Sequence, residues 1–147
     1  MKALFALALI SVIAPLSAGE TKLGTGVALK DVTEIKALVE QPAAYVGKTL
    51  RVDGVATAVC AHMGCWMAVA GPGPGSGNEG GATVRIKVDD GVIVFPVTAK
   101  GRKVSAEGVF EIVGNTGDAK DASEEHAKHD AGASRQYQLR ATGAIIY

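Results

Sequence analysis

The chain has 147 residues, which is the length of a single domain. Its 15 basic and 15 acidic residues balance to a formal net charge of +0. Such a balance gives no electrostatic footprint of a protein that binds nucleic acid or anionic lipid, so we expect no nucleic-acid partner.

Residues 1–19 have the order of a secretory signal peptide. Lys2 supplies the positive start, "ALFALALISVIAPL" the apolar region, and "SAGE" the small residues at which cleavage occurs. The apolar run is too short to span a bilayer, and no stop-transfer pattern follows it, so we expect no membrane span. We expect cleavage after Ala18 or Gly19 and a periplasmic or secreted protein. Residues 20–147 then form one domain.

The first element expected after the cleavage site is a short helix over residues 31–40, within "DVTEIKALVEQP". Asp31 can cap it, with Glu34 three residues later completing a capping box. Pro42 ends it. The helix carries one apolar stripe, formed by Val32, Ile35, Leu38 and Val39.

The rest of the chain is typical of short strands separated by turns. Apolar and polar residues alternate cleanly in "ATVRIKV", and glycines interrupt two longer strands at Gly54 and Gly108, which favours a bulge or a bend there. We expect strands near 49–60, 65–70, 82–88, 92–96, 103–113 and 136–146. We expect these buried positions: Val84, Ile86, Val104 and Leu139. The pattern predicts a mainly β protein, a small Greek-key barrel of five to six strands like the oligonucleotide/oligosaccharide-binding (OB) fold, with one short N-terminal helix.

Two segments depart from the strand pattern. "GPGPGSGNEGG", residues 71–81, is typical of a flexible loop, and residues 114–135 form a polar insertion whose only apolar residue type is alanine. The insertion contains His126 and His129, which on a helix would share a face and could bind a metal as a secondary site. A solvated charged face is the more ordinary interpretation of such a composition.

The stretch "VCAHMGCWMAV" gathers both cysteines of the chain, its only tryptophan and one of its three histidines. Four residues separate Cys60 from Cys65, and Gly64 at the last of them favours a hairpin turn with a left-handed residue. The two cysteines should then face each other across the strands. Alternation places Cys65 and Met67 on one face and Trp66 on the other.

Three interpretations of this hairpin remain open. The first is a structural disulfide between Cys60 and Cys65, which the expected compartment favours. The second is a soft-metal site for copper or zinc, with the ligand set Cys60, His62, Met63, Cys65 and Met67. The third is a pair of thiols that take part in redox exchange. Met63 favours the second interpretation, because a thioether at a loop tip gains nothing from burial.

The residues resemble the bacterial domain-of-unknown-function family DUF4920. The similarity lies in "YVGKTLRVDGVATAVCAHMGCWMAV", in the later "FPV" and "GRKVSAEGV", and in the terminal "LRATGAIIY", and it covers roughly Gly26 to Tyr147. The C-x4-C-W-M element is the specific part. The resemblance implies an exported small β-barrel domain and brings no catalytic residue. The long 71–81 loop departs from the family pattern.

No group of residues forms an enzyme signature. The sequence shows no Ser/His/Asp set typical of nucleophilic catalysis, and the adjacent carboxylates Asp89 and Asp90 are typical of a turn. We therefore predict no catalytic residue. We therefore expect an exported, non-enzymatic binding module centred on the Cys60–Met67 hairpin, with a soft metal ion or a periplasmic protein as its partner. The alternative is a disulfide-stapled barrel that binds a protein or glycan through its surface.

Overall fold

The structure is a computed structural model that describes residues 19–73, 81–113 and 137–147. The predicted signal peptide lies outside these residues except for Gly19. Most of the glycine-rich loop and the polar insertion, with His126 and His129, also lie outside them.

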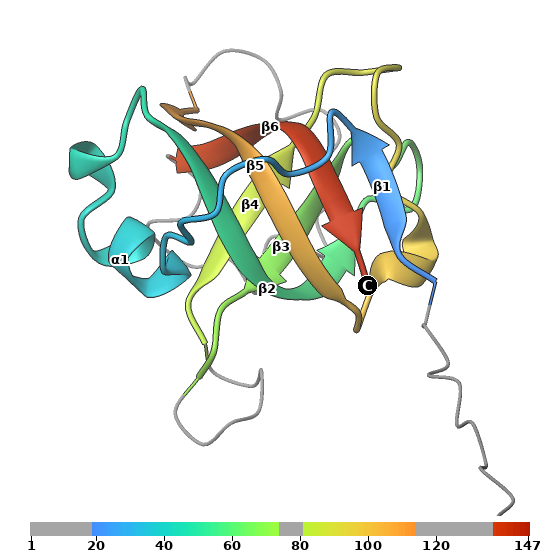
Figure 1. Ribbon diagram of the computed structural model, residues 1–147, viewed down its shortest axis with the longest axis horizontal. Helices are drawn as coiled ribbons and strands as arrows, with labels where there is room; N and C mark the ends of the chain where they lie inside the picture. Colours follow the sequence, from blue (N-terminus) through green and yellow to red (C-terminus); the bar gives the residue numbers. More distant parts are fainter. Residues whose placement is uncertain (1–18, 74–80, 114–136) are drawn as a thin grey trace, which may run out of the picture.

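Five strands close into a barrel (Figure 1). They are β2 (Thr49–Val59), β3 (Trp66–Ala70), β4 (Thr83–Lys87), β5 (Lys103–Ile112) and β6 (Tyr137–Ile146). Around the barrel the order is β2-β3-β4-β6-β5, and β5 pairs again with β2. All of these pairs are antiparallel except β4 with β6, which are parallel. The predicted OB-like barrel is confirmed. A sixth strand, β1 (Thr21–Gly24), pairs with β6 outside the ring.

The core lies inside the barrel and follows the period-two alternation of the strands. Val84 and Ile86 on β4 are 4% and 0% exposed, and Val104 and Leu139 are buried to the same degree, as predicted. The largest fully buried side chains include Phe95 and Phe110. Burial of this apolar surface is the main stabilising term of such a small domain.

The two mid-strand glycines have different roles. The register between β5 and β6 shifts between Glu107 and Gly108, so the bulge predicted at Gly108 is confirmed. A Cβ on Gly108 would collide with the carbonyl oxygen of Arg140. On β2 the register shift falls between Ala56 and Ala58, not at Gly54. A Cβ on Gly54 would instead collide with a backbone carbonyl of β3, so this glycine permits a close approach between two strands.

The helix is shorter than the sequence pattern predicts. Helix α1 spans Ile35–Glu40, because Val32 forms a parallel bridge with Arg51 and the Thr33 N–H donates to the Arg51 carbonyl at 2.7 Å. The capping box was wrong for the same reason: Glu34 is the N-cap, and its side chain makes no capping hydrogen bond. A 3-10 turn, η1 (Pro42–Ala44), follows. No helix of the described segments is long and apolar enough to cross a bilayer.

The strand predicted over 92–96 was wrong. Its side chains do alternate, with Ile93 and Phe95 buried and Val92 and Val94 exposed. The backbone, however, is held by a single bond to the neighbouring hairpin, from the Phe95 N–H to the Gly64 carbonyl at 2.9 Å. Pro96 has no N–H to extend a ladder, and the 3-10 turn η2 (Val97–Ala99) follows it.

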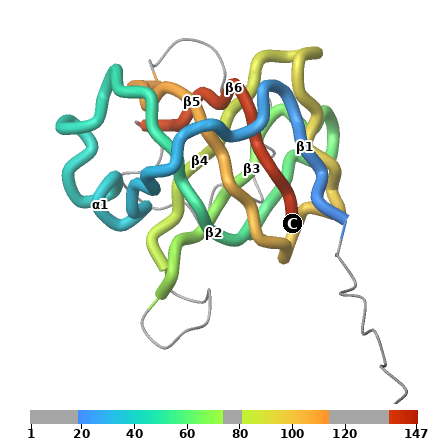
Figure 2. Tube along the Cα trace, in the orientation of Figure 1, coloured from blue at the N-terminus to red at the C-terminus, as the bar shows by residue number. Residues whose placement is uncertain are grey.

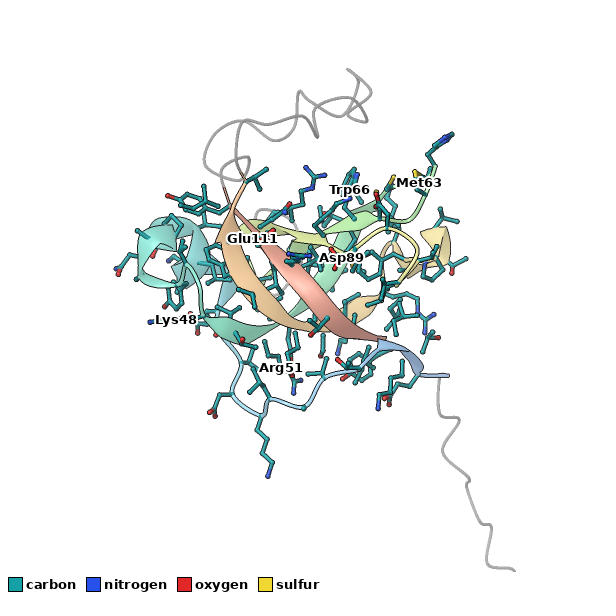
Figure 3. All side chains as sticks on the ribbon, turned by 90° about the horizontal axis from the view of Figure 1, so that it is seen from above. Lys48, Arg51, Met63, Trp66, Asp89 and Glu111 are labelled. Carbon is teal, nitrogen blue, oxygen red and sulfur yellow. The ribbon has the colours of Figure 1, made fainter. Side chains whose placement is uncertain are left out.

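The N-terminal segment covers one side of the barrel, where it crosses the outside of β5 and β2 (Figure 2). The Glu107 carboxylate accepts hydrogen bonds from the backbone N–H groups of Ala28 and Leu29, both at 2.7 Å. Arg51 donates to the Leu29 carbonyl from β2. Figure 3 shows Arg51 on this side of the barrel and Met63 on the opposite side. The N-terminal segment therefore leaves the cysteine hairpin uncovered.

Candidate functional site: the cysteine hairpin

The hairpin between β2 and β3 carries both cysteines. Val59 is the partner of Met67, and the Cys60 N–H donates to the Trp66 carbonyl at 3.0 Å. Cys60 therefore lies opposite Trp66, and Cys65 belongs to the turn. The expectation that the cysteines are direct cross-strand partners was wrong by one residue. The faces were predicted correctly, because Cys65 and Met67 are buried while Trp66 is half-buried under the Arg85 guanidinium, 5.3 Å from its ring centroid.

Gly64 fixes the shape of the turn. Its φ is +61°, the left-handed conformation that the sequence predicts for it. Its N–H donates to the Cys60 carbonyl at 3.0 Å, and a Cβ on it would lie 2.6 Å from the Phe95 carbonyl oxygen. Glycine is required here both by the backbone conformation and by the close approach of the 92–96 segment.

The two sulfurs are neighbours. The Cys65 thiol donates to the Cys60 sulfur, with 3.9 Å between the two Sγ atoms, and both residues are free thiols in the structure. Cys65 is 6% exposed, whereas Cys60 is half-buried. The pair thus combines one partly exposed cysteine with one buried cysteine. The disulfide stays a prediction.

The turn favours ionisation of the Cys60 thiol. Partial burial opposes the thiolate, but hydrogen bonds from the backbone N–H groups of Met63 and His62 and from the Cys65 thiol outweigh it. Together they hold the pKa of Cys60 below its ordinary value. Convergent backbone donors of this kind stabilise a negatively charged sulfur, which is the form that binds metals and attacks electrophiles.

Cys65 has the opposite bias. Burial raises the pKa of the Cys65 thiol, and the Lys87 ammonium group beside it opposes that shift only in part. Lys87 also pairs with Asp90 at 3.3 Å. Lys87 was missed in the sequence, where it is one of two outward basic residues of an alternating strand. Its place beside Cys65 depends on the pairing of β3 with β4.

Cys60 should be alkylated before Cys65 in the reduced protein. The thiolate is the reacting form, and a pKa below the ordinary value leaves more thiolate on Cys60 at neutral pH. Iodoacetamide labelling across a pH series, read by peptide mass spectrometry, should give half-modification of Cys60 at lower pH than of Cys65. Equal profiles, or earlier labelling of Cys65, would contradict these electrostatics.

The other predicted ligands divide into two groups. His62 is exposed and Met63 is 50% exposed, so both side chains are available on the solvent side of the turn. Met67 is fully buried and belongs to the core cluster. Packing accounts for Met67, and we do not include it among the candidate ligands. Within the described residues, no three His, Cys, Asp or Glu side chains form a metal-holding group, so any third ligand would have to come from a thioether or from movement of the turn.

An apolar ridge lies beside the turn and was missed in the sequence. It consists of Met63, Val92 and Val94, whose side chains are 50%, 72% and 60% exposed. Val94 borders the turn, since one of its methyl groups would lie 2.8 Å from a Cβ on Gly64. The side chains of segment 92–96 alternate, so Ile93 and Phe95 are buried while Val92 and Val94 face outward.

In comparisons with known proteins, no family model matches the chain, and no curated protein matches it. The resemblance to DUF4920 therefore stays a prediction.

Proposed function

We propose that the protein is an exported, non-enzymatic binding domain that holds one soft metal ion, Cu(I) or Zn(II), between Cys60 and Cys65. Thiolate sulfur is the ligand that these ions prefer in proteins. The observation that carries the proposal is the pair of free thiols 3.9 Å apart on one side of the turn.

The spacing of the sulfurs suits a shared ion. With metal–sulfur bonds of about 2.3 Å, a separation of 3.9 Å gives an angle of about 116° at the metal. This angle lies between tetrahedral and trigonal geometry, so one ion fits between the sulfurs where they stand. The backbone donors on Cys60 also favour the thiolate that a metal needs.

The turn offers the remaining ligands. His62 and Met63 lie between the two cysteines in the loop and are exposed, so their side chains can turn toward an ion at the sulfurs. A thioether favours Cu(I), and an imidazole suits either ion. A fold that only needed a disulfide here would gain nothing from a half-exposed methionine.

Competition titration of the reduced protein with Cu(I) and Zn(II) tests the proposal. Replacing both thiols (Cys60→Ser with Cys65→Ser) should abolish tight binding, and His62→Ala with Met63→Ala should weaken it by at least about tenfold, because each change removes ligands. Met67→Leu is the matched control: it removes a thioether from the buried core with little change of volume and should leave the affinity unchanged. Equal affinity of wild type and the double serine variant would refute the metal site.

The second candidate function is a disulfide-stapled barrel that binds a protein partner. The apolar ridge favours a protein over a glycan, because its exposed side chains are aliphatic. A photo-crosslinking probe placed at the exposed Val97, close in sequence to the ridge, should crosslink to the protein partner. The double substitution Val92→Asp with Val94→Asp should abolish this crosslink while the domain stays folded. A crosslink that survives both substitutions would exclude the ridge as the contact.

A further inference from the structure

The cysteine hairpin also has the arrangement of a reactive dithiol. Cys60 is half-buried at the edge of an exposed turn, and Cys65, whose sulfur lies 3.9 Å from that of Cys60, is buried. The Cys65 thiol already points its hydrogen at the Cys60 sulfur, so the two atoms are in contact across 3.9 Å. This inference uses the same two sulfurs as the proposed function but needs no metal.

From this geometry we infer that the reduced protein reacts with an accessible disulfide in two ordered steps, with Cys60 as the attacking residue and Cys65 as the resolving residue. The order follows from access. Cys60 is half-buried at the rim of an exposed turn, whereas Cys65 is 6% exposed and shielded from any large reagent.

The chemistry balances as follows. The Cys60 thiolate attacks one sulfur of the external disulfide, whose S–S bond breaks and releases its other sulfur as a thiolate. Cys65 loses its proton to solvent and attacks the Cys60 sulfur, and the external group leaves as a second thiolate. The Cys60–Cys65 dithiol is oxidised by two electrons to a disulfide, and the external disulfide is reduced to two thiols.

The turn can accommodate the second step. Closing the Cys60–Cys65 bond requires the sulfurs to approach by about 2 Å. Residues 61–63, between the cysteines, are exposed, so they can shift without disturbing the core. Gly64 is fixed by its contact with Phe95, which confines the movement to the first part of the turn.

The external disulfide can belong to a small molecule or to a protein. The exposed apolar ridge of Met63, Val92 and Val94 at the turn favours a protein. Hydroxyethyl disulfide and insulin serve as the two probes. A reaction with insulin that slows in Val92→Asp assigns protein disulfides to the site. A reaction with the small probe alone assigns small disulfides.

The deciding experiment follows each product by mass spectrometry in the presence of a metal chelator. Wild type should lose two hydrogens and retain no adduct. Cys65→Ser should retain the external group on Cys60, and Cys60→Ser should react at least about tenfold more slowly, because Cys65 is shielded. A persistent adduct on wild type, an adduct formed first on Cys65, or no reaction with either probe would overturn the inference. Because the chelator removes metal ions from this assay, none of these results depends on metal binding. The metal titration therefore tests the proposed function separately.

Discussion

Val84→Asp is expected to unfold the domain. Val84 lies on β4, which pairs with β3 and β6, and its side chain belongs to the core and is 4% exposed. An aspartate there must either bury an unpaired charge or pull the strand out of the barrel. The cost is about 3–5 kcal/mol, which is a large part of the free energy of unfolding of a typical domain, about 5–15 kcal/mol. Circular dichroism and thermal denaturation should show a protein that is largely unfolded at 25 °C or has lost most of its stability.

The matched control is Val92→Asp. It makes the same chemical change at a valine that is 72% exposed, outside the barrel ladder. Its free energy of unfolding should stay within about 0.5 kcal/mol of wild type, as for most surface substitutions. If Val84→Asp were as stable as Val92→Asp, the placement of β4 in the barrel would be wrong.

Gly108→Ala should have the next largest effect on stability. A Cβ at this position would meet the carbonyl oxygen of Arg140 and lie 2.6 Å from the Ala141 Cα, both backbone atoms of β6. A backbone cannot swing aside as a side chain can, so the bulge where β5 meets β6 must open. We expect a loss of about 2–4 kcal/mol, from the cost of overpacking and the weakened pairing.

Val109→Ala is the control for this substitution. It is the next residue on β5, and its side chain is 37% exposed. Removing its methyl groups should cost less than about 1 kcal/mol, the span of strand propensity. Equilibrium unfolding in urea measures both variants. Equal losses for the two would show that the close approach at Gly108 is relieved without cost.

Most of the barrel could be predicted because it depends on local periodicity. Alternating residues such as Val84 and Ile86 identify β4 in any context, and the bounds of the five barrel strands differ from those expected by only one residue at most. The features that were wrong depend on distant partners. Helix α1 starts late because the Thr33 N–H is bound to the Arg51 carbonyl on β2. Segment 92–96 is no strand because it makes only one backbone hydrogen bond to the neighbouring hairpin, and Pro96 has no N–H to add another.

The site could be predicted in composition but not in detail. The spacing of Cys60 and Cys65 indicated a shared role, and Gly64 was recognised by its turn chemistry. The backbone donors on Cys60 and the approach of Lys87 to Cys65 could not be found, because both require the register of the turn and of β3 against β4. A register error of one residue was enough to misplace Cys65.

X-ray absorption at the copper edge of the Cu(I)-loaded protein tests the central proposal most directly, because it reports the atoms bound to the metal. Two free thiols 3.9 Å apart should bind one copper per chain. The first shell should contain at least two sulfurs at about 2.2–2.3 Å. This shell should disappear in the variant that combines Cys60→Ser with Cys65→Ser. A first shell of nitrogen and oxygen alone, or a sulfur shell that persists in the double serine variant, would contradict the proposed site.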